Sequence, residues 1–386
     1  MDKPDSIDAW LQELGKPSAD RDYKPGHDRV KSLLAQIDLK KPLLRVRVAG
    51  TNGKGSTANM LAAALSACGM RVGLYTSPHI HRFNERIRVD GKAADDSRLL
   101  SGLERLMPIA QQCGVSYFEM ATALALDCFS EANVDVEILE AGVGARLDAT
   151  TAVPADMALI TPIGLDHQAW LGDSVEQIAT EKSYVGDGCR WIISAPQSQT
   201  VAKVLTDRRP EIVFVNMDTR LPALAAHGDF QRINAALAWQ AALLLQQARL
   251  IRSDARVVDA IAETRVPCRM QLMELRGRRI WLDAGHNRHA VEAVVAACHS
   301  MGEHFDAILV FSREDRDLSQ DLPLLRPICH RLVSGGAGNS ETVDACYANF
   351  GAAISAEIGR KSSGNFLILG SFATVAAAQD WARRQL

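Results

Sequence analysis

Short apolar runs of strand length alternate with longer helical patterns over most of the chain. The runs expected to form strands are 43–48, 71–75, 134–139, 157–160, 191–194 and 211–215. The stretches expected to form helices are 57–68, 117–131, 175–184 and 230–247. Such alternation is typical of a mostly parallel sheet with helices on both faces. The pattern therefore predicts an α/β protein with a doubly wound sheet.

The alternation breaks near residues 264–267 and resumes on a smaller scale. Beyond the break, the expected strands are 279–282, 307–311, 331–333 and 366–369, and the expected helices are 290–301, 341–358 and a last one from Thr374. A chain of 386 residues is long for a single hydrophobic core. We therefore predict two domains, a larger one over 1–264 and a smaller one over 265–386.

Composition narrows the classes of function. Hydrophobic residues make up 47% of the chain, and its formal net charge is −3, so it lacks the basic footprint of a nucleic-acid-binding protein. No apolar run approaches the roughly 18 residues of a membrane span, and the first residues lack a signal peptide's apolar stretch. The eight cysteines form no Cys-x-x-Cys pair, so neither a zinc site nor a disulfide framework is predicted. We expect a cytoplasmic globular protein that binds neither nucleic acid nor membranes.

The segment Gly50-Thr-Asn-Gly-Lys-Gly-Ser56 joins the first predicted strand to a helical segment. Glycines in such a turn let backbone N–H groups approach phosphate oxygens, and the helix start adds the positive end of its dipole. Lys54 supplies a mobile cation, although Gly55 separates it from Ser56 and breaks the strict phosphate-loop spacing. An ordinary glycine-rich turn is the alternative. A second glycine-rich run, 335–339, is not followed by Lys-Ser and is predicted to be a surface loop.

Polar residues follow the other strands of the predicted sheet. In chain order they are Ser77, Glu140 and His167. Ligands of open α/β sheets bind at the carboxyl ends of strands, so we expect these side chains beside the phosphate loop. Magnesium prefers oxygen ligands and shares them with phosphates. Taken singly, His167 is more often a capping or core residue than a metal ligand, and Glu140 could be an ion-pair partner of Arg146.

Short motifs also recur along the chain in a fixed order. They are GTNGKGS at 50–56, SPH at 77–79, NERIR at 84–88, YFEMA at 117–121, EAGVGARLDAT at 140–150, GLDH at 164–167, LGD at 171–173, EK at 181–182, NAA at 234–236, DAGHN at 283–287 and GSF at 370–372. Together they resemble the folylpolyglutamate synthase/dihydrofolate synthase family over most of the chain. The glycine after Lys54 resembles this family more than the related Mur ligases, whose loop has Ser or Thr directly after the lysine.

The resemblance implies an ADP-forming ligase with a P-loop ATPase domain, a smaller Rossmann-like domain and an active site in the cleft between them. An acceptor carboxylate, from dihydropteroate or a reduced folate, would take the γ-phosphoryl group of ATP. The amino group of L-glutamate would then displace phosphate from the acyl phosphate. Such chemistry depends on positioning and charge neutralisation instead of a protein nucleophile. Members of the family are generally monomeric, so a monomer is expected.

The resemblance also implies a role for each matching residue. The nucleotide would contact Asn52, Gly53, Lys54, Gly55, Ser56, Asn234, Arg269 and Asp283. Mg²⁺, expected at two sites, would bind Ser56, Ser77, Glu140 and His167. The catalytic residues would be Lys54, Lys182, His167 and His286, and the substrates would contact Arg29, Tyr117, Phe118, Arg146, Asp148 and Ser371. Lys182 matches a carbamylated lysine of the family; a surface lysine beside Glu181 is the alternative.

The chain departs from the family at positions that bear on the choice of acceptor. They are Ala145, Thr151, Cys268, Arg288, Phe311 and the N-terminal block 24–29, which matches only in part. Phe311 and Arg288 could reshape a substrate pocket or be neutral changes. A related ligase that joins an amino acid to a non-folate carboxylic acid is therefore an alternative function. A nucleotide-binding protein without ligase activity is a third, against which the retained Lys54 and Glu140 argue.

Overall fold

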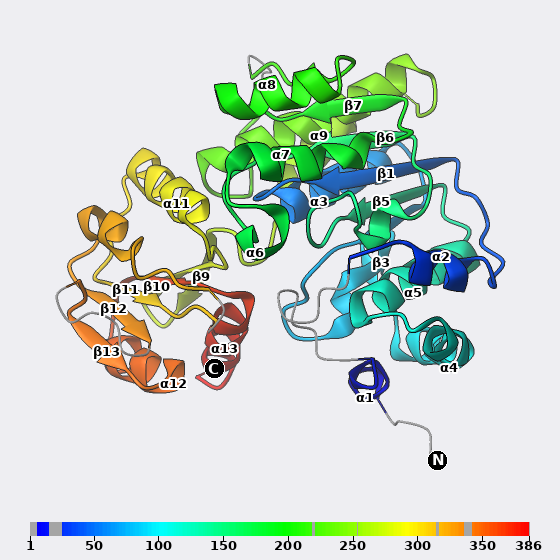
Figure 1. The fold of residues 1–386 in the computed structure, drawn as a ribbon. Helices are drawn as coiled ribbons and strands as arrows, with labels where there is room; N and C mark the ends of the chain where they lie inside the picture. Colours follow the sequence, from blue (N-terminus) through cyan, green and yellow to red (C-terminus); the bar gives the residue numbers. More distant parts are fainter. Residues whose placement is uncertain are drawn as a thin grey trace. The chain divides into compact units, whose positions relative to one another are not determined.

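The computed structural model describes residues 6–14, 25–217, 221–252, 254–313, 316–335 and 342–385. The chain divides into two compact units, each with its own sheet (Figure 1). The first unit comprises Met1–Ala223 and Ile233–Thr264, and the second comprises Leu224–Arg232 and Arg265–Leu386. Both are layered from strands and helices, so the predicted α/β fold class is confirmed.

The described residues of the first unit form an eight-stranded sheet in the order β4-β3-β2-β5-β1-β6-β7-β8. The strands are β1 Leu44–Ala49, β2 Val72–Tyr75, β3 Ile87–Val89, β4 Lys92–Ala93, β5 Val136–Glu140, β6 Met157–Ile160, β7 Trp191–Ser194 and β8 Val213–Phe214. They are parallel except for β3 and β4, which add an antiparallel edge. β1 is fully buried between β5 and β6, where the order of the strands reverses. Ligands of doubly wound sheets bind at such a point.

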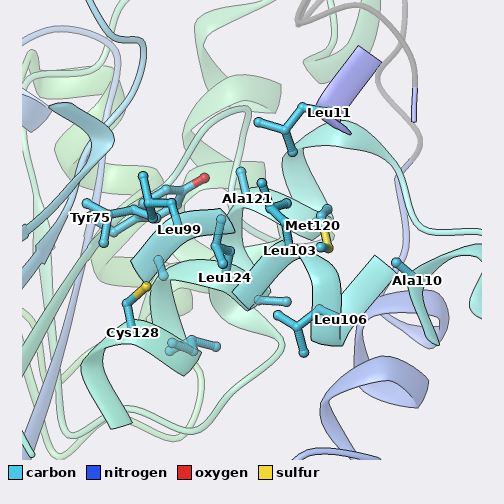
Figure 2. Close-up of a cluster of buried hydrophobic side chains, with 14 of the residues drawn as sticks. Leu11, Tyr75, Leu99, Leu103, Leu106, Ala110, Met120, Ala121, Leu124 and Cys128 are labelled. Atoms are coloured by element: carbon cyan, nitrogen blue, oxygen red, sulfur yellow. The ribbon is translucent and has the colours of Figure 1, made fainter. Parts of the chain in front are cut away.

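Helices cover this sheet. They are α1 Ile7–Gln12, α2 Asp28–Leu34, α3 Lys54–Ala67, α4 Asp96–Cys113, α5 Tyr117–Ala132, α6 Gln168–Leu171, α7 Val175–Ser183, α8 Gln199–Arg208, α9 Asp229–Gln247 and α10 Arg256–Glu263. Ser116 and Glu119 start α5 with a capping box, and Asn133 ends it in the left-handed conformation. Apolar side chains of α1, α4 and α5 pack together in the core shown in Figure 2. This packing holds the start of α5 in place.

The described residues of the second unit form a six-stranded sheet in the order β13-β12-β11-β14-β10-β9. Its strands are β9 Gln271–Leu275, β10 Arg278–Asp283, β11 Ala307–Val310, β12 Leu332–Gly335, β13 Ala345–Tyr347 and β14 Gly364–Leu369. Its helices are α11 Arg288–Met301, α12 Phe350–Ile354 and α13 Phe372–Arg383. Only β9 is antiparallel among these strands. Apolar residues of β10, β11, β14 and α11 form its core.

Several elements differ from the sequence-based expectation, among them the following two. The helix predicted over 341–358 starts too early: β13 occupies its first part and pairs with β12, and helical structure begins only at Phe350, in α12, which Asn349 caps, and continues through Ser355–Gly359. α4 was not predicted, although Asp95 caps it, because Pro108 interrupts the helical pattern. Residues 336–339 of the second glycine-rich run lie outside the described residues. No helix in the described part of the chain is long and apolar enough to span a membrane.

Candidate functional site

Two glycines shape the loop that follows β1. Gly50 has a φ of +145°, and a Cβ there would lie 2.0 Å from Thr161 Oγ1. Gly53 has a φ of +92°, and a Cβ there would lie 2.2 Å from Asn234 Oδ1. Any larger residue would be strained and would clash at both positions. The predicted nucleotide residue Asn234 therefore packs directly on this loop.

The loop after β1 is bonded to the loop after β6. The backbone N–H groups of Thr51 and Asn52 donate to the Pro162 carbonyl at 3.0 and 3.3 Å. The Thr51 hydroxyl donates to the Gly164 carbonyl at 3.0 Å. These bonds fix the loop against the segment that leads to His167.

Helix α3 begins at Lys54 without a side-chain cap, because its N-cap residue is Gly53. The Lys54 ammonium donates to the carbonyls of Gly50 and Thr51 at 3.3 and 3.1 Å. Ser56 is buried, and its Oγ has no hydrogen-bond partner in the part of the chain that the structure describes. A buried hydroxyl without a partner, at an uncapped helix start below a lysine, suits a phosphate or its metal ion.

Glu140 ends β5 with its carboxylate against the start of α3. A Cβ on Gly55 would lie 3.5 Å from Glu140 Oε2, and this same oxygen accepts from the backbone N–H of Ser77 at 2.9 Å. The structure thus brings Ser56, Ser77 and Glu140 to one edge of the sheet. The residues fit Mg²⁺, which favours hydroxyl and carboxylate oxygens shared with phosphates. Over the described ranges, no three His, Cys, Asp or Glu side chains cluster as a self-sufficient metal site.

His167 follows β6 in the left-handed conformation, with a φ of +50°. Its Nε2 lies 3.8 Å from Asp166 Oδ2, and its backbone N–H donates to Asp166 Oδ1 at 2.9 Å. Asp166 is buried and was not predicted from the sequence, although it stands inside the GLDH block. Asp166 therefore bonds the backbone of His167 and lies near its imidazole.

Lys182 on α7 is buried, which contradicts the surface alternative. Its ammonium donates to the Gly50 carbonyl at 2.7 Å. Burial, and then the nearby Lys54, lowers the pKa of Lys182 to about 7. Two lysines thus converge on the carbonyl of Gly50. A substantial fraction of Lys182 is a neutral amine near pH 7.

Arg146 and Asp148 belong to the loop after β5, and their described contacts are made within the protein. Arg146 pairs with Glu181 at 3.0 Å, so it is not the partner of Glu140. Asp148 is buried and accepts from the N–H groups of Gly142 and Val143 at 2.9 and 3.0 Å. Burial raises the pKa of Asp148. These bonds hold the shape of the loop.

Of the remaining expected acceptor residues, Phe118 lies against the same loop, whereas Arg29 and Tyr117 contact other segments. Arg29 pairs with Glu119 of α5 at 3.1 Å. His27 Nε2 lies 3.0 Å from both the Asp148 carbonyl and the Thr151 hydroxyl, so the partly matched N-terminal block is attached to the loop after β5. The described contacts of Tyr117 and Phe118 are made at the buried start of α5. Tyr117 meets Phe83 edge to face, and a Cβ on Gly142 would lie 2.7 Å from the Phe118 ring.

In the second unit, Arg269 and Asp283 lie together. Asp283 is buried at the end of β10 and accepts from the N–H groups of Met270 and Gly285 at 2.9 and 2.7 Å. Burial raises the pKa of Asp283, and the charge of Arg269 opposes that shift. Arg269 also lies over the Phe372 ring at 4.8 Å. His286, in the turn after β10, has Nδ1 3.0 Å from the Ala284 carbonyl.

Ser371 is the N-cap of α13. Its Oγ accepts from the Thr374 N–H at 3.0 Å and lies 2.7 Å from Thr374 Oγ1. Its described partners therefore all belong to the helix cap, and its contact with substrate stays a prediction.

Three of the departures from the family, Phe311, Arg288 and Cys268, lie in the second unit. Phe311 is buried, packs on Gly335 and meets Phe350 edge to face, so it is a core residue and not a pocket wall. Arg288 is exposed and pairs with Glu292 at 2.9 Å. Cys268 takes a left-handed φ of +58°, which favours glycine.

The sequence matches no protein-family model. It is similar to the dihydrofolate synthase/folylpolyglutamate synthase of Escherichia coli K12, with 32% identity over 406 residues that cover 96% of this chain and 94% of that protein. The protein of the same name from Bacillus subtilis is 29% identical, and the match covers 80% of each chain.

Solved structures agree with this similarity. E. coli FolC in complex with DHPP and ADP matches with a TM-score of 0.84 and 28% identity, over 98% of both chains. The bifunctional folylpolyglutamate synthase/dihydrofolate synthase from Yersinia pestis, complexed with AMPPNP and a Mn ion, matches with a TM-score of 0.83 and 27% identity, over 99% of this chain and 100% of that one.

Proposed function

The chain belongs to the dihydrofolate synthase/folylpolyglutamate synthase family, and we propose that it joins L-glutamate to the carboxylate of dihydropteroate or of a reduced folate. The chain is an ATP-dependent ligase by this membership. The observation that carries the proposal is the start of α3: an uncapped helix, Lys54 above it, and a buried Ser56 hydroxyl without a partner among the described residues. A role without catalysis is less consistent with these features, and the similarity to folate ligases favours a folate acceptor over a non-folate one.

The reaction proceeds in two steps. An acceptor carboxylate oxygen attacks the γ-phosphorus, the bond to the β-phosphate oxygen breaks, and ADP leaves. The amino nitrogen of glutamate then attacks the acyl carbon, loses a proton and expels phosphate to give the amide. Lys54 and the N–H groups at the start of α3 offset the negative charge on the transferring group. Asn52, Gly53 and Gly55 hold the phosphates, and Asn234 supports the loop from α9.

Magnesium, when bound, neutralises phosphate charge and orients the γ-phosphoryl group. We assign Ser56, Ser77, Glu140 and His167 to its two sites. The buried Glu140 carboxylate beside Gly55 supports this assignment. Asp166 fixes the backbone of His167 through the N–H bond to its Oδ1.

Lys182 is the residue that we propose to be carbamylated. A neutral amine is needed because its lone pair forms the bond to the carbon of CO₂ and the nitrogen loses a proton. The burial of Lys182 and its pKa of about 7 support this chemistry. The product would carry two oxygens where an ammonium stood, and would serve as an oxygen ligand near the second Mg²⁺.

We further assign the larger domain, 1–264, to ATP and the acceptor, and the smaller one, 265–386, to glutamate and part of the nucleotide. Arg269 and Asp283 contact the nucleotide, and His286 and Ser371 lie near the phosphate or the glutamate. The acceptor residues are Arg29, Tyr117, Phe118, Arg146 and Asp148. The protein acts as a cytoplasmic monomer.

The test is ADP release by the purified protein with ATP, Mg²⁺ and L-glutamate, with and without dihydropteroate or tetrahydrofolate. We expect ADP release that depends on the pterin, and a product heavier by one glutamyl unit in mass spectrometry. ATP binding without any pterin dependence would instead favour a non-folate acceptor. Failure to release ADP with any carboxylic acid would favour the non-catalytic alternative.

A further inference from the structure

Arg86, in the NERIR block, has no role in the reaction described above. The residue is buried, with 5% of its surface exposed. Its guanidinium carbon lies 5.9 Å from the centre of the Phe83 ring and 5.7 Å from that of Tyr117. These rings meet edge to face, with their centres 6.3 Å apart. Aromatic walls therefore shield the positive charge of Arg86 from bulk water.

The described neighbours of Arg86 form no ion pair with it. Its Nε donates to His79 Nδ1 at 2.9 Å, and an imidazole that accepts this hydrogen bond does not balance a positive charge. Glu85 is committed to the backbone N–H groups of residues 80–82, and Asp8 of α1 is exposed. Across the described ranges, no carboxylate pairs with Arg86.

The two terminal nitrogens of Arg86 have no acceptor among the described residues. Neither nitrogen is among the fully buried atoms without a partner, so both keep some exposed surface. A buried arginine normally has its terminal nitrogens bonded to a carboxylate or to carbonyls, as Arg47 has here by the carbonyl of Val185. Within the described part of the chain, the Arg86 guanidinium therefore keeps two N–H groups that could donate to an anion.

Arg86 lies beside the residues assigned to the reaction. Its carbonyl accepts from the Thr76 N–H at 2.9 Å, and the next residue, Ser77, donates to Glu140. On its other side stands Tyr117, the first residue of α5 and an expected acceptor residue. Arg86 therefore lies between the segment of Ser77, a predicted metal ligand, and Tyr117, an expected acceptor residue.

We propose that Arg86 forms a subsite for the non-reacting α-carboxylate of a glutamylated acceptor, whose γ-carboxylate is the group that reacts. This inference rests on the proposed function. The fork of arginine matches a carboxylate with two parallel hydrogen bonds, and a desolvated setting strengthens them. The reacting carboxylate is a poor partner for Arg86, because such pairing would weaken its attack on phosphorus. Dihydropteroate has no second carboxylate and would leave Arg86 unpaired.

The test compares two acceptors in Arg86→Gln, with Arg82→Gln as the control from the same segment, where Arg82 is exposed and pairs with Asp96. We expect the KM for tetrahydrofolate to rise by about tenfold or more in Arg86→Gln, while the KM values for dihydropteroate and ATP stay within about twofold. Arg82→Gln should change none of them. Equal effects on both acceptors, or none, would overturn the subsite.

A second measurement uses the wild-type protein and does not depend on the folding of a variant. A folate analogue with a carboxamide in place of the α-carboxylate should bind about tenfold more weakly than the parent compound. Equal binding of the two would refute the role of Arg86. If wild-type protein uses neither pterin acceptor, the proposed function fails first, and this result is distinct from a selective failure at Arg86.

Discussion

Two strand-to-helix turns, one in each unit, begin alike and end differently. After β1 and after β14, a glycine with positive φ lets the chain approach a neighbouring backbone: Gly50 beside Thr161, and Gly370 beside Phe311. Ser371 then caps α13, whereas Gly53 leaves α3 without a side-chain cap. The first helix start keeps its N–H groups for an anion, while the second is closed by its own serine.

The two turns also differ in the positively charged side chains next to them. Lys54 and Lys182 both donate to the Gly50 carbonyl, one from the loop itself and one from α7. Around the Ser371 cap, the hydroxyls of Ser371 and Thr374 bond each other instead. The same strand–turn–helix unit therefore serves binding in one case and stability in the other, depending on the cap and on nearby charge.

The largest expected effect comes from Lys54→Ala. Removal of the phosphate cation should lower the turnover of ATP by about 1,000-fold, because phosphoryl transfer depends on charge neutralisation. The measurement is ADP release with saturating substrates. Lys203→Ala, at an exposed lysine of α8, is the control and should keep full activity. Near wild-type turnover in Lys54→Ala would remove this residue from the mechanism.

Lys182→Ala should lower activity by about 100-fold if the lysine carries a carbamate that binds metal. Short-chain carboxylic acids should restore part of the activity by supplying the missing oxygens. Mass spectrometry of the wild-type protein in bicarbonate provides a second readout, as an added carbamate increases the mass. A variant that turns over normally would count against the modified lysine.

Gly53→Ala should destabilise the first unit by about 3 kcal/mol, since it combines a left-handed backbone with a clash against Asn234. Gly69→Ala is a matched control: Gly69 has a φ of +81°, but a Cβ there would meet nothing within 4 Å. Gly69→Ala should lower the free energy of unfolding by only about 1 kcal/mol. Urea unfolding of both variants separates the clash from the backbone strain, and equal losses would mean that Asn234 moves aside.

The buried Lys182 should also make stability depend on pH. Its pKa is about 7 in the folded chain and 10.5 as the ordinary value, so between these limits the unfolded state holds a proton that the folded state lacks. Stability should therefore rise from pH 7 to pH 9, by at most about 1.4 kcal/mol per pH unit, and the effect should vanish below pH 7. In CO₂-free buffer, Lys182→Met should lose this slope; an unchanged slope would assign it to another group.

The smallest effect is expected at Ser371. Ser371→Ala removes the cap of α13 and should lower the free energy of unfolding by about 1 kcal/mol. Asn349→Ala, which removes the cap of α12, should have an effect of similar size. A rise in the KM for glutamate in the first variant alone would show that Ser371 also contacts substrate, as the family resemblance implies.

Much of the fold was predictable because most strands coincide with short apolar runs in the sequence. β6 and β7 begin and end where their apolar runs do. β13 was missed because its short run, 345–347, becomes a strand only by pairing with β12. The burial of Lys182 could not be predicted either. The sequence around Glu181 and Lys182 does not distinguish a surface helix from a helix that packs on the phosphate loop.

By itself, the sequence determined the α/β class, the phosphate loop and the order of strand ends, because hydrophobic period and glycine placement are local properties. Only the tertiary structure decided which side chains meet. It buried Lys182 against Gly50, set Glu140 over Gly55, turned Ser371 into a cap, and placed Arg86 against two aromatic rings. Such pairings join residues far apart in the chain, and burial then sets their charge and chemistry.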